Sequence, residues 1–544
     1  MKMKTILVGI NSKYIHPNLA IRYLKANTTY PVDILEFNIK DPIESIVTSC
    51  LEHRPDLIGF SVYIWNINII NNVLKHIRHL SPTTKILLGG PEVSFVNQNY
   101  FDNQLTDYII VNEGEIAFHL LLTALNHHND LSNIPNLIYQ KDGKTIKNKC
   151  SVIENLDALK DPYTTIDEKD ISHKIQYVEL SRGCPYKCSY CLASLEKGVR
   201  FFSMKRVKKT IQYLANKGAK TFKFLDRSFN ANHKLAQELL TFIIDQNYQD
   251  IVFQFEINGD VLKDSFIDFL IKKAPSNLIR FELGIQSTND QVNQAVRRYQ
   301  DTTKLIENIK KLKQSNVVLH LDLIAGLPLE DLESFKNTFN TIYQLFGHEL
   351  QLGFLKVLKG TDIYHKASLY QITYDSLAPY EIIESQYISK EDLAIIHQVE
   401  IMLNIYWNKG FMPKTMTYLT QNQDAFAFFL DLYQFYINNQ YSTLRYGLID
   451  LFTRLIDFLK QQNKYNHTID SYLKYDYLNH HPIKPKIYWQ HPTHKNQILR
   501  DYQKTNPNIP IDLLYKHSVV TEYLTGYLIV FYQRNHKLIT FFEY

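Results

Sequence analysis

The stretch "SRGCPYKCSYC", residues 181–191, carries three of the five cysteines of this 544-residue chain with the spacing C-x3-C-x2-C. No fourth cysteine lies nearby, although a structural zinc site is normally closed by four protein ligands. The stretch therefore predicts a metal centre that takes three thiolates, from Cys184, Cys188 and Cys191, and leaves one position to another group.

The other two cysteines, Cys50 and Cys150, stand alone, so the chain has no disulfide framework and a reducing compartment is favoured. The first residues lack the core of a signal peptide, and the longest apolar run near the end is too short to span a membrane. A formal net charge of +5 does not argue for nucleic acid. We expect a cytoplasmic protein with no membrane or nucleic-acid partner.

Residues 1–125 alternate short apolar runs with amphipathic helical patterns, which predicts a doubly wound, Rossmann-like parallel α/β sheet. Ligands bind such sheets beyond the carboxyl ends of the strands. Three loops meet this description: Gly9–Asn11, Gly89–Pro91 and Asn112–Glu115. The strand candidates are Thr5–Val8, Asp33–Phe37, Leu57–Tyr63, Lys85–Leu88 and Asp107–Val111.

Residues 126–172 read as a connector with a hairpin that turns at Asp142–Gly143. Residues 173–365 alternate again, and their six β-α units predict a (β/α)6 partial barrel with its active site at the carboxyl ends of the strands. Residues 366–544 predict a mainly helical domain with a hairpin in 526–544. The barrel strand candidates are Gln176–Leu180, Thr221–Leu225, Val252–Glu256, Ile279–Ile285, Val317–Asp322 and Gln351–Val357.

The three cysteines directly follow the first predicted barrel strand. Thiolates select iron–sulfur clusters or zinc, and three thiolates on a [4Fe–4S] cube leave one iron open to a cofactor. The arrangement resembles the signature of radical S-adenosylmethionine (radical SAM) enzymes, in which the open iron takes the amino and carboxylate groups of the cofactor. The alternative is a zinc site closed by a distant ligand such as His173.

Further fragments resemble radical SAM barrel motifs in the expected order, and the resemblance implies that their polar residues bind the cofactor. "FKFLDRSFN" resembles an F-x-D-D-x-F form but has Arg227 in place of the second aspartate. Each carboxylate alone is more often a helix cap. The implied residues are Tyr190 before the last cysteine, Asp226, Glu256 in "FEINGD", Gln286 and Ser287 in "ELGIQS", and Asp322 in "DLIAGLPLED".

The first domain resembles the cobalamin-binding domain that precedes many radical SAM barrels. "ILLGGPEVSF" and "DYIIVNEGE" match its two ligand loops, with Glu92 and Asn112 in place of the usual residues. No D-x-H-x-x-G motif occurs, so we expect cobalamin to bind without a histidine on the cobalt, and His16 to be a loop or capping residue. The alternative is a domain that has lost its ligand. The implied cobalamin residues are Gly89, Gly90, Glu113, Gly114 and Glu115.

The chain as a whole resembles cobalamin-binding radical SAM proteins with a C-terminal domain of unknown function. This implies a 5′-deoxyadenosyl radical, methyl transfer to an unactivated carbon of a small molecule or peptide, and an electron donor such as flavodoxin or ferredoxin. A radical rearrangement or oxidation without methyl transfer stays open. A tRNA methylthiotransferase would need a second three-cysteine cluster in the first domain, which offers only Cys50. A cobalamin or redox sensor would bind the cofactors without cleaving them.

Overall fold

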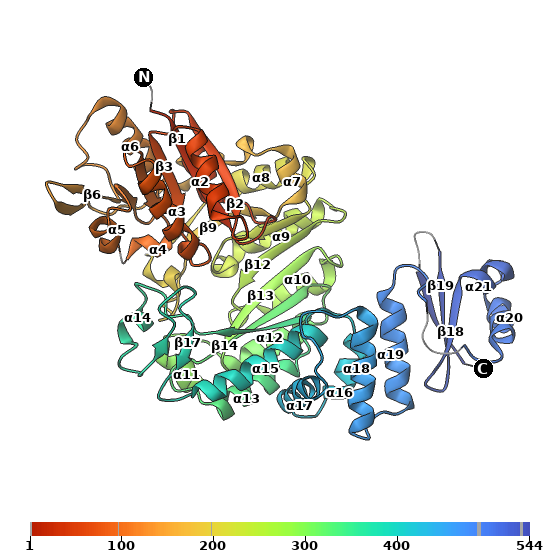
Figure 1. Cartoon of the computed structure of the whole chain (residues 1–544). Coiled ribbons are helices and arrows are strands. Elements are labelled where there is room, and N and C mark those ends of the chain that lie inside the picture. Colours follow the sequence, from red (N-terminus) through yellow and green to blue (C-terminus); the bar gives the residue numbers. More distant parts are fainter. Residues whose placement is uncertain (1–2, 96, 197, 487–490, 534–536, 544) are drawn as a thin grey trace. The chain divides into compact units, whose positions relative to one another are not determined.

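The computed structural model describes residues 3–95, 97–196, 198–486, 491–533 and 537–543. It divides into two compact units, one formed by residues 1–331 and 353–390 and the other by residues 332–352 and 391–544. Figure 1 labels the elements of both units in chain order. The first unit contains two successive α/β sheets, and the second is built mainly from helices.

The first sheet has seven strands in the order β2-β1-β3-β4-β5-β6-β7. Its first five strands are parallel, as the alternating sequence pattern predicts, and β6 pairs with β5 in the antiparallel sense. The strands are β1 (Thr5–Asn11), β2 (Val32–Asn38), β3 (Leu57–Ser61), β4 (Lys85–Gly89), β5 (Tyr108–Ile110), β6 (Leu137–Lys141) and β7 (Lys144–Lys147). The helices are α1 (Leu19–Ala26), α2 (Ile43–Glu52), α3 (Ile67–Leu80), α4 (Pro91–Ser94), α5 (Gln98–Asp102) and α6 (Glu115–His127).

Alternate residues of the interior strand β1 enter two different cores. Ile6 and Val8 pack with residues of α2 and α3, whereas Leu7 packs with residues of α1 and α6. Because successive side chains of a strand point to opposite faces, a strand that is apolar throughout must be covered on both sides. The doubly wound fold expected from the sequence is therefore confirmed.

The segment after α6 extends this sheet. Strands β6 and β7 form the predicted hairpin, and the turn residues Asp142 and Gly143 have positive φ angles of 51° and 73°. Such angles are typical of the two-residue turns that suit the twist of a hairpin. The 3-10 turns η1 (Leu156–Ala158) and η2 (Tyr163–Thr165) and helix α7 (Glu168–His173) then lead to the second sheet.

The second sheet has six strands in the order β15-β14-β13-β12-β11-β8, which is the open-barrel order predicted from the sequence. The strands are β8 (Gln176–Val178), β11 (Thr221–Phe224), β12 (Val252–Ile257), β13 (Ile279–Gln286), β14 (Val318–Ala325) and β15 (Glu349–Phe354). The helices between them are α8 (Met204–Asn216), α9 (His233–Asp245), α10 (Asp264–Lys273), α11 (Asp290–Ala295) and α12 (Thr302–Leu312), with the turn η4 (Phe229–Ala231) before α9.

Burial alternates strictly along the barrel strands. One face is fully buried and rich in phenylalanine: Phe222 stacks on Phe253, and Phe224 on Phe255, with ring centroids 4.6 Å apart in both pairs. The opposite face is partly buried and polar, and carries the side chains that could contact ligands. A small antiparallel pair, β9 (Ser181–Gly183) and β10 (Val199–Phe201), flanks the cysteine segment and the turn η3 (Leu192–Leu195), and was not predicted.

After β15, the first unit continues through α14 (Asp362–Lys366), β16 (Thr373–Tyr374) and β17 (Ile382–Glu384). The second unit contains α13 (Leu332–Tyr343), α15 (Lys390–Tyr406), α16 (Pro413–Thr420), α17 (Ala425–Asn438), α18 (Leu448–Gln461), α19 (His467–His480), α20 (Lys495–Thr505) and α21 (Ile511–His517). A three-stranded sheet ends it, formed by β18 (Ser518–Tyr523), β19 (Gly526–Tyr532) and β20 (Lys537–Phe542).

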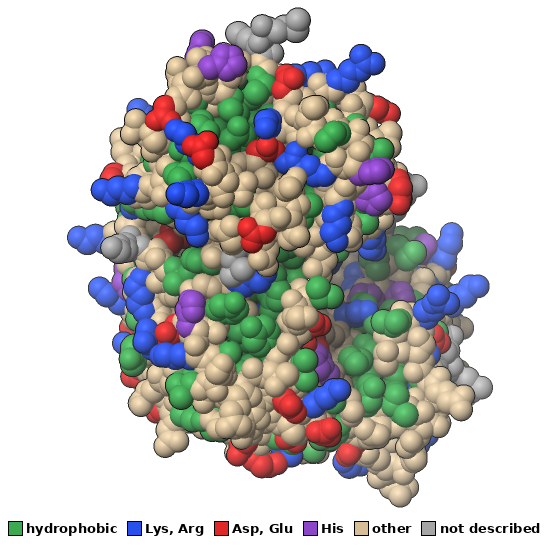
Figure 2. Space-filling model, turned by 60° about the vertical axis from the view of Figure 1, so that its left-hand side comes forward, with side chains coloured by type: hydrophobic (Ala, Val, Ile, Leu, Met, Phe, Trp, Pro, Cys, Tyr) green, Lys and Arg blue, Asp and Glu red, His purple; other side chains and the backbone are tan. Residues whose placement is uncertain are grey.

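The hairpin predicted near the chain end is confirmed by the antiparallel pairing of β19 and β20. Residues 534–536 and 544 of the predicted segment lie outside the described residues. Within the second unit, four aromatic rings surround the Lys414 ammonium at 4.4 to 5.6 Å, those of Tyr472, Tyr475, Tyr523 and Phe541. Among the described residues, no helix has the length and apolarity to cross a membrane. Figure 2 shows basic, acidic and apolar side chains interspersed on one face.

Candidate functional site at the carboxyl end of the barrel

The three cysteines follow strand β9 and form a tightly held loop. Cys184 and Cys188 are buried, and Cys191 is partly buried. Burial raises the pKa of the Cys184 thiol, and the neighbouring Cys191 and Cys188 raise it further, so the three thiols lie close together. Gly183 precedes them with a φ of +93°, and a Cβ there would lie 2.2 Å from the Gly198 carbonyl oxygen. Only glycine therefore fits at the entrance to the loop.

Backbone hydrogen bonds fix this loop to the barrel. The Ser189 N–H donates to the Val296 carbonyl at 2.8 Å, and the Ile363 N–H donates to the Ser189 carbonyl at 2.9 Å. Tyr190 has Arg298 as a neighbour, and its predicted contact with the adenine of the cofactor stays a prediction. Burial opposes the charge of Arg298, but Tyr190 and Cys188 raise its pKa. The loop is thus preorganised by protein contacts.

The zinc alternative gains no support from the position of His173. This residue ends α7, where its Nδ1 contacts the Lys169 carbonyl oxygen and the Ser172 hydroxyl. Among the described residues, no three His, Cys, Asp or Glu side chains converge as ligands of a single ion.

Asp226 and Glu256 end neighbouring strands but differ in their surroundings. Asp226 is 1% exposed and accepts hydrogen bonds from the Leu180 N–H, at 2.9 Å, and from the Ser181 hydroxyl. Burial raises its pKa to about 7. Its side chain therefore fixes the approach to the cysteine loop, and a cofactor contact for it stays a prediction. Glu256 is partly buried, and no described residue forms a hydrogen bond or ion pair with it.

Gln286 and Ser287 lie where β13 bulges against β14. Gln286 has a φ of +70°, and its buried Oε1 finds no hydrogen-bond donor among the described residues. Ser287 is fully buried and donates to Glu330 Oε1 at 2.6 Å. Burial raises the pKa of Glu330 to about 8, so this carboxyl group is mainly neutral at pH 7. Gln286 is thus available to a ligand, whereas Ser287 contacts the protein.

Asp322 belongs to a chain of polar contacts on the inner face of the barrel. Its Oδ1 lies 3.0 Å from His320 Nε2, and Arg280 Nη2 lies 2.7 Å from His320 Nδ1. Burial raises the pKa of Asp322, with His320 opposing the shift. Glu282, in the neighbouring row, accepts a hydrogen bond from Gln254 at 2.7 Å. The inner face is therefore charged and largely paired with itself.

At the carboxyl edge of the first sheet, the two predicted glycines differ in how closely the protein packs against them. Gly90 has a φ of +116°, and a Cβ there would lie 2.4 Å from the Val62 carbonyl oxygen, whereas Gly89 is less crowded. Glu92 faces the protein, because the Tyr380 hydroxyl donates to its Oε2 at 2.7 Å. Trp65, 44% exposed at this edge, stacks on Tyr63 with centroids 4.4 Å apart.

His16 is confirmed as a residue of the loop between β1 and α1. Its Nδ1 lies 2.6 Å from the hydroxyl of Tyr177, on barrel strand β8, and the two rings stack with centroids 6.1 Å apart. The predicted glycine loop and the partly exposed Trp65 offer a close-packing backbone and an aromatic ring to a macrocycle, and binding without a histidine on the cobalt stays a prediction. Residues of the edge thus suit the corrin ring of cobalamin.

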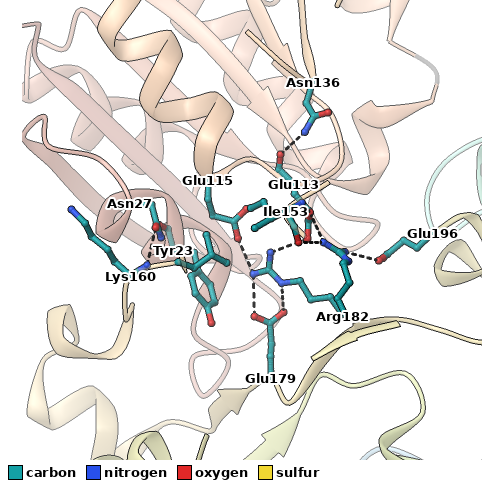
Figure 3. Close-up of polar contacts among 12 residues, drawn as sticks. Tyr23, Asn27, Glu113, Glu115, Asn136, Ile153, Lys160, Glu179, Arg182 and Glu196 are labelled. Carbon is teal, nitrogen blue, oxygen red and sulfur yellow. Dashed lines mark hydrogen bonds and ion pairs between the residues drawn. The ribbon is translucent and has the colours of Figure 1, made fainter. Parts of the chain in front are cut away.

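Glu113 and Glu115, predicted as cobalamin residues together with Gly114, take part in a buried ion-pair cluster (Figure 3). Arg182 Nη1 lies 3.1 Å from Glu113 Oε1, and Arg182 Nη2 lies 2.8 Å from Glu115 Oε1. Arg182 also pairs with Glu179 at 3.0 Å, and Arg200 pairs with Glu113 at 2.9 Å. Burial raises the pKa of Glu113, but Arg200 and Arg182 lower it overall.

This ion-pair cluster joins the β5–α6 loop to strand β9, two residues before Cys184. Both glutamate side chains face the protein, so their contact with cobalamin stays a prediction, and the structure assigns them a connecting role. No motif in the sequence marked Arg182 or Arg200 as partners of these glutamates. The one hint was that Arg182 lies beside the cysteines, but a charged residue is common in any loop.

Comparison with known proteins identifies three successive regions. Residues 5–122 match the B12 binding domain, residues 178–342 match the radical SAM superfamily, and residues 368–518 match the protein of unknown function DUF4080. The order agrees with the order expected from the sequence. The first two regions imply a [4Fe–4S] cluster, S-adenosylmethionine and cobalamin.

The similarity to characterised relatives extends over only part of each relative's sequence. An anaerobic magnesium-protoporphyrin IX monomethyl ester cyclase of Synechocystis sp. is 27% identical over 50% of this chain and 56% of its own. The cobalamin-dependent radical SAM methyltransferase TokK of Streptomyces tokunonensis is 26% identical over 57% of this chain and 47% of its own. The chain thus spans about half the length of these curated relatives.

Two solved structures share the fold. The cobalamin-dependent radical enzyme OxsB, with aqua-cobalamin bound, superposes with a TM-score of 0.62 at 15% identity over 88% of this chain and 78% of its own. The methyltransferase TsrM of Kitasatospora setae, with cobalamin and a [4Fe–4S] cluster bound, gives a TM-score of 0.57 at 15% identity over 69% and 78%. With its cysteine loop, barrel and preceding sheet, the chain is a radical SAM protein with an N-terminal B12-binding domain and a C-terminal DUF4080 domain.

Proposed function

We propose that the protein is a cobalamin-dependent radical SAM enzyme that methylates an unactivated carbon of a small molecule or peptide. One observation carries the proposal: the carboxyl end of a barrel that follows a B12-binding domain holds the three-thiol loop and two acceptors, Glu256 and the Oε1 of Gln286, that have no hydrogen-bond partner within the described part of the chain. The loop offers a place for the cluster, and the two acceptors offer hydrogen-bond partners for S-adenosylmethionine.

When bound, the cluster and S-adenosylmethionine supply a radical that removes hydrogen from carbon, and cobalamin supplies the methyl group. The residues of the chain hold and orient these groups. Cys184, Cys188 and Cys191 would ligate the cluster, and the hydrogen bonds of Ser189 keep their loop against the barrel. The Arg182 cluster keeps the β5–α6 loop next to this region, so both cofactor sites stay in register.

The relatives support methyl transfer and also suggest one alternative. TokK and TsrM are methyltransferases by name, and a further relative of 24% identity is a 2-(S-pantetheinyl)-carbapenam-3-carboxylate methyltransferase. The Synechocystis relative is instead a cyclase. A cobalamin-assisted oxidation or rearrangement without methyl transfer is therefore the second candidate.

Methyl-deuterated S-adenosylmethionine distinguishes the two candidates. The reconstituted, reduced protein with cobalamin would be incubated anaerobically with cell extract, and the products analysed by mass spectrometry. Methyl transfer predicts a product that gains the deuterated methyl, together with 5′-deoxyadenosine and S-adenosylhomocysteine. A Cys184→Ala variant should form none of the three, and a Cys150→Ala variant should behave as wild type. A product formed with 5′-deoxyadenosine but without label or S-adenosylhomocysteine would refute methyl transfer.

The remaining expectations form part of the same proposal. An electron donor such as flavodoxin or ferredoxin would reduce the cluster, and the cysteine usage favours a cytoplasmic location. A methylthiotransferase activity is disfavoured, although such an enzyme of Hydrogenobaculum sp. is 24% identical over 43% of this chain. Cys50 is fully buried in α2 and Cys150 is exposed, so these two provide no second cluster site.

A further inference from the structure

Arg227 is a cation at the proposed site that has no side-chain partner among the residues the structure describes. It follows Asp226 directly after strand β11, and its side chain is exposed. No described residue forms a hydrogen bond or ion pair with its guanidinium. This contrasts with Arg182, Arg200 and Arg298, which all have protein partners.

The surroundings of Arg227 define where its charge acts. Its positive charge acts on the thiols of Cys184 and Cys191, on the carboxylate of Glu256 and on Tyr63. These groups come from the cysteine loop, from the end of β12 and from the edge of the first sheet. Arg227 therefore lies at the mouth of the barrel, beside the cysteine loop and the neighbouring strand end.

The opposite charges of Arg227 and Glu256, both at the mouth of the barrel, do not pair with each other. Arg227 and Glu256 influence each other electrostatically, yet they form no ion pair. A guanidinium has five N–H donors and no acceptor, and its planar fork matches carboxylate and phosphate groups. Where a second aspartate would accept a hydrogen bond from a cationic group, Arg227 can only donate hydrogen bonds, and an anionic group is its strongest acceptor.

We propose that Arg227 binds an anionic group, a carboxylate or phosphate, of the ligand that lies over the cysteine loop. Two sources offer this chemistry: the methionyl carboxylate of S-adenosylmethionine, or an anionic group of the substrate. The proposal rests on the proposed function only in that a ligand occupies this mouth. Methyl transfer could fail its own test while the anion site stands, because binding alone is measured below.

Chemical labelling of arginine tests the proposal on the wild-type chain. The reconstituted, unreduced protein would be treated with phenylglyoxal, and modification of Arg227 measured by peptide mass spectrometry. Four samples suffice: no addition, S-adenosylmethionine, S-adenosylmethionine with phosphate or acetate, and S-adenosylmethionine with acetamide as the neutral match of acetate. The exposed Arg445 provides an internal reference for reagent reactivity.

Affinity measurements on variants complete the test. If the methionyl carboxylate is the source, S-adenosylmethionine protects Arg227, and Arg227→Gln weakens its binding about 10- to 100-fold, with a smaller loss for Arg227→Lys. The matched Arg445→Gln change should leave the affinity unaltered. If the substrate is the source, S-adenosylmethionine does not protect, phosphate or acetate does, and acetamide does not.

Two results would overturn the proposal. Modification of Arg227 at an equal rate in all four samples would show that no anion binds there. Protection by S-adenosylmethionine with an unchanged affinity in Arg227→Gln would show that the cofactor merely covers the residue. If the four wild-type samples show equal modification and Arg227→Gln also shifts the reduction potential of the cluster, the anion site is refuted and Arg227 instead tunes the cluster.

Discussion

The loop after β5 and the ends of β11 and β12 both place charged side chains at the carboxyl edge of a parallel sheet, but they use these charges differently. In the loop after β5, Glu113 and Glu115 pair with Arg182, and all three are at most 14% exposed. At the barrel mouth, Arg227 and Glu256 have no partner among the described residues. Both regions resembled ligand loops in the sequence, yet only the second has charges left for a ligand.

The difference has an energetic reason. A buried charge is tolerated when opposite charges and hydrogen bonds surround it, and the Arg182 cluster supplies both. Charges that stay unpaired near a solvent-open mouth keep their hydration until a ligand replaces the water. The ion pairs of Arg182 therefore indicate a structural connection, whereas the unpaired charges of Arg227 and Glu256 indicate a binding surface. Four predictions follow this contrast, in order of decreasing effect.

The largest effect is expected at the barrel, where removing a cysteine thiol should prevent the cluster from binding. Changing Cys184, Cys188 or Cys191 to Ala should abolish the absorbance of the cluster, because a cube loses a required ligand. Cys50→Ala and Cys150→Ala should keep iron near the value of about four per chain expected for one cube. Stoichiometric zinc, without iron uptake in anaerobically purified wild type, would contradict the assignment.

The ion-pair cluster around the β5–α6 loop is tested by Arg182→Met. This change leaves three glutamates near one another without the cation that they share. Removing one partner of a buried ion pair typically costs about 3–5 kcal/mol in the free energy of unfolding. Denaturant unfolding monitored by circular dichroism measures the change. The exposed Arg445→Met serves as the control and should change stability by less than about 0.5 kcal/mol. An equal effect of the two variants would show that the cluster carries no stability.

Glu330 is a third kind of charged-type residue, a buried carboxyl group with no cation beside it among the described residues. Burial raises its pKa to about 8 and so keeps it mainly protonated at pH 7. Since this folded-state pKa exceeds the unfolded value, the folded state binds the proton more tightly. Stability from this group is present at low pH and is lost as pH rises through about 8. Between pH 6 and 8, wild type should lose about 2 kcal/mol relative to Glu330→Gln.

The measurement for Glu330 is the free energy of unfolding at several pH values for both proteins. The exposed Glu333→Gln is the matched control, because its side chain is 75% exposed and should follow the wild-type curve. Parallel curves for wild type and Glu330→Gln would mean that Glu330 is already ionised in the folded protein.

The smallest expected effect comes from Glu256→Gln. Since Glu256 forms no hydrogen bond or ion pair with any residue that the structure describes, its change should leave the free energy of unfolding within about 0.5 kcal/mol of wild type. The affinity for S-adenosylmethionine should fall about tenfold, because a charge-assisted hydrogen bond becomes a neutral one. Equilibrium binding to the reconstituted protein measures this, with the exposed Glu44→Gln as control. Unchanged affinity together with lowered stability would place Glu256 among the structural charges.

Much of the architecture followed from local patterns. The alternating apolar runs predicted the first five parallel strands and the six barrel strands, and the ends of these strands differ from the predictions by only a few residues. The spacing of the cysteines predicted a three-thiolate loop directly after the first barrel strand. Strand pairs such as β9–β10 escaped prediction, because three-residue strands have too short a pattern to detect.

Periodic burial and cysteine spacing are properties of a few consecutive residues, so the sequence by itself determines the features that depend on them. For this protein these features are the two α/β sheets, the cluster loop and the strand ends that could face a cofactor. Which of these polar residues stay free was decided only by the tertiary structure. Arg182 meets Glu113 across 69 positions, and Tyr380 meets Glu92 across 288. Such pairs depend on how distant segments dock, and the same glutamate can bind a ligand or an arginine. Their geometry is therefore fixed by packing, which no local pattern encodes.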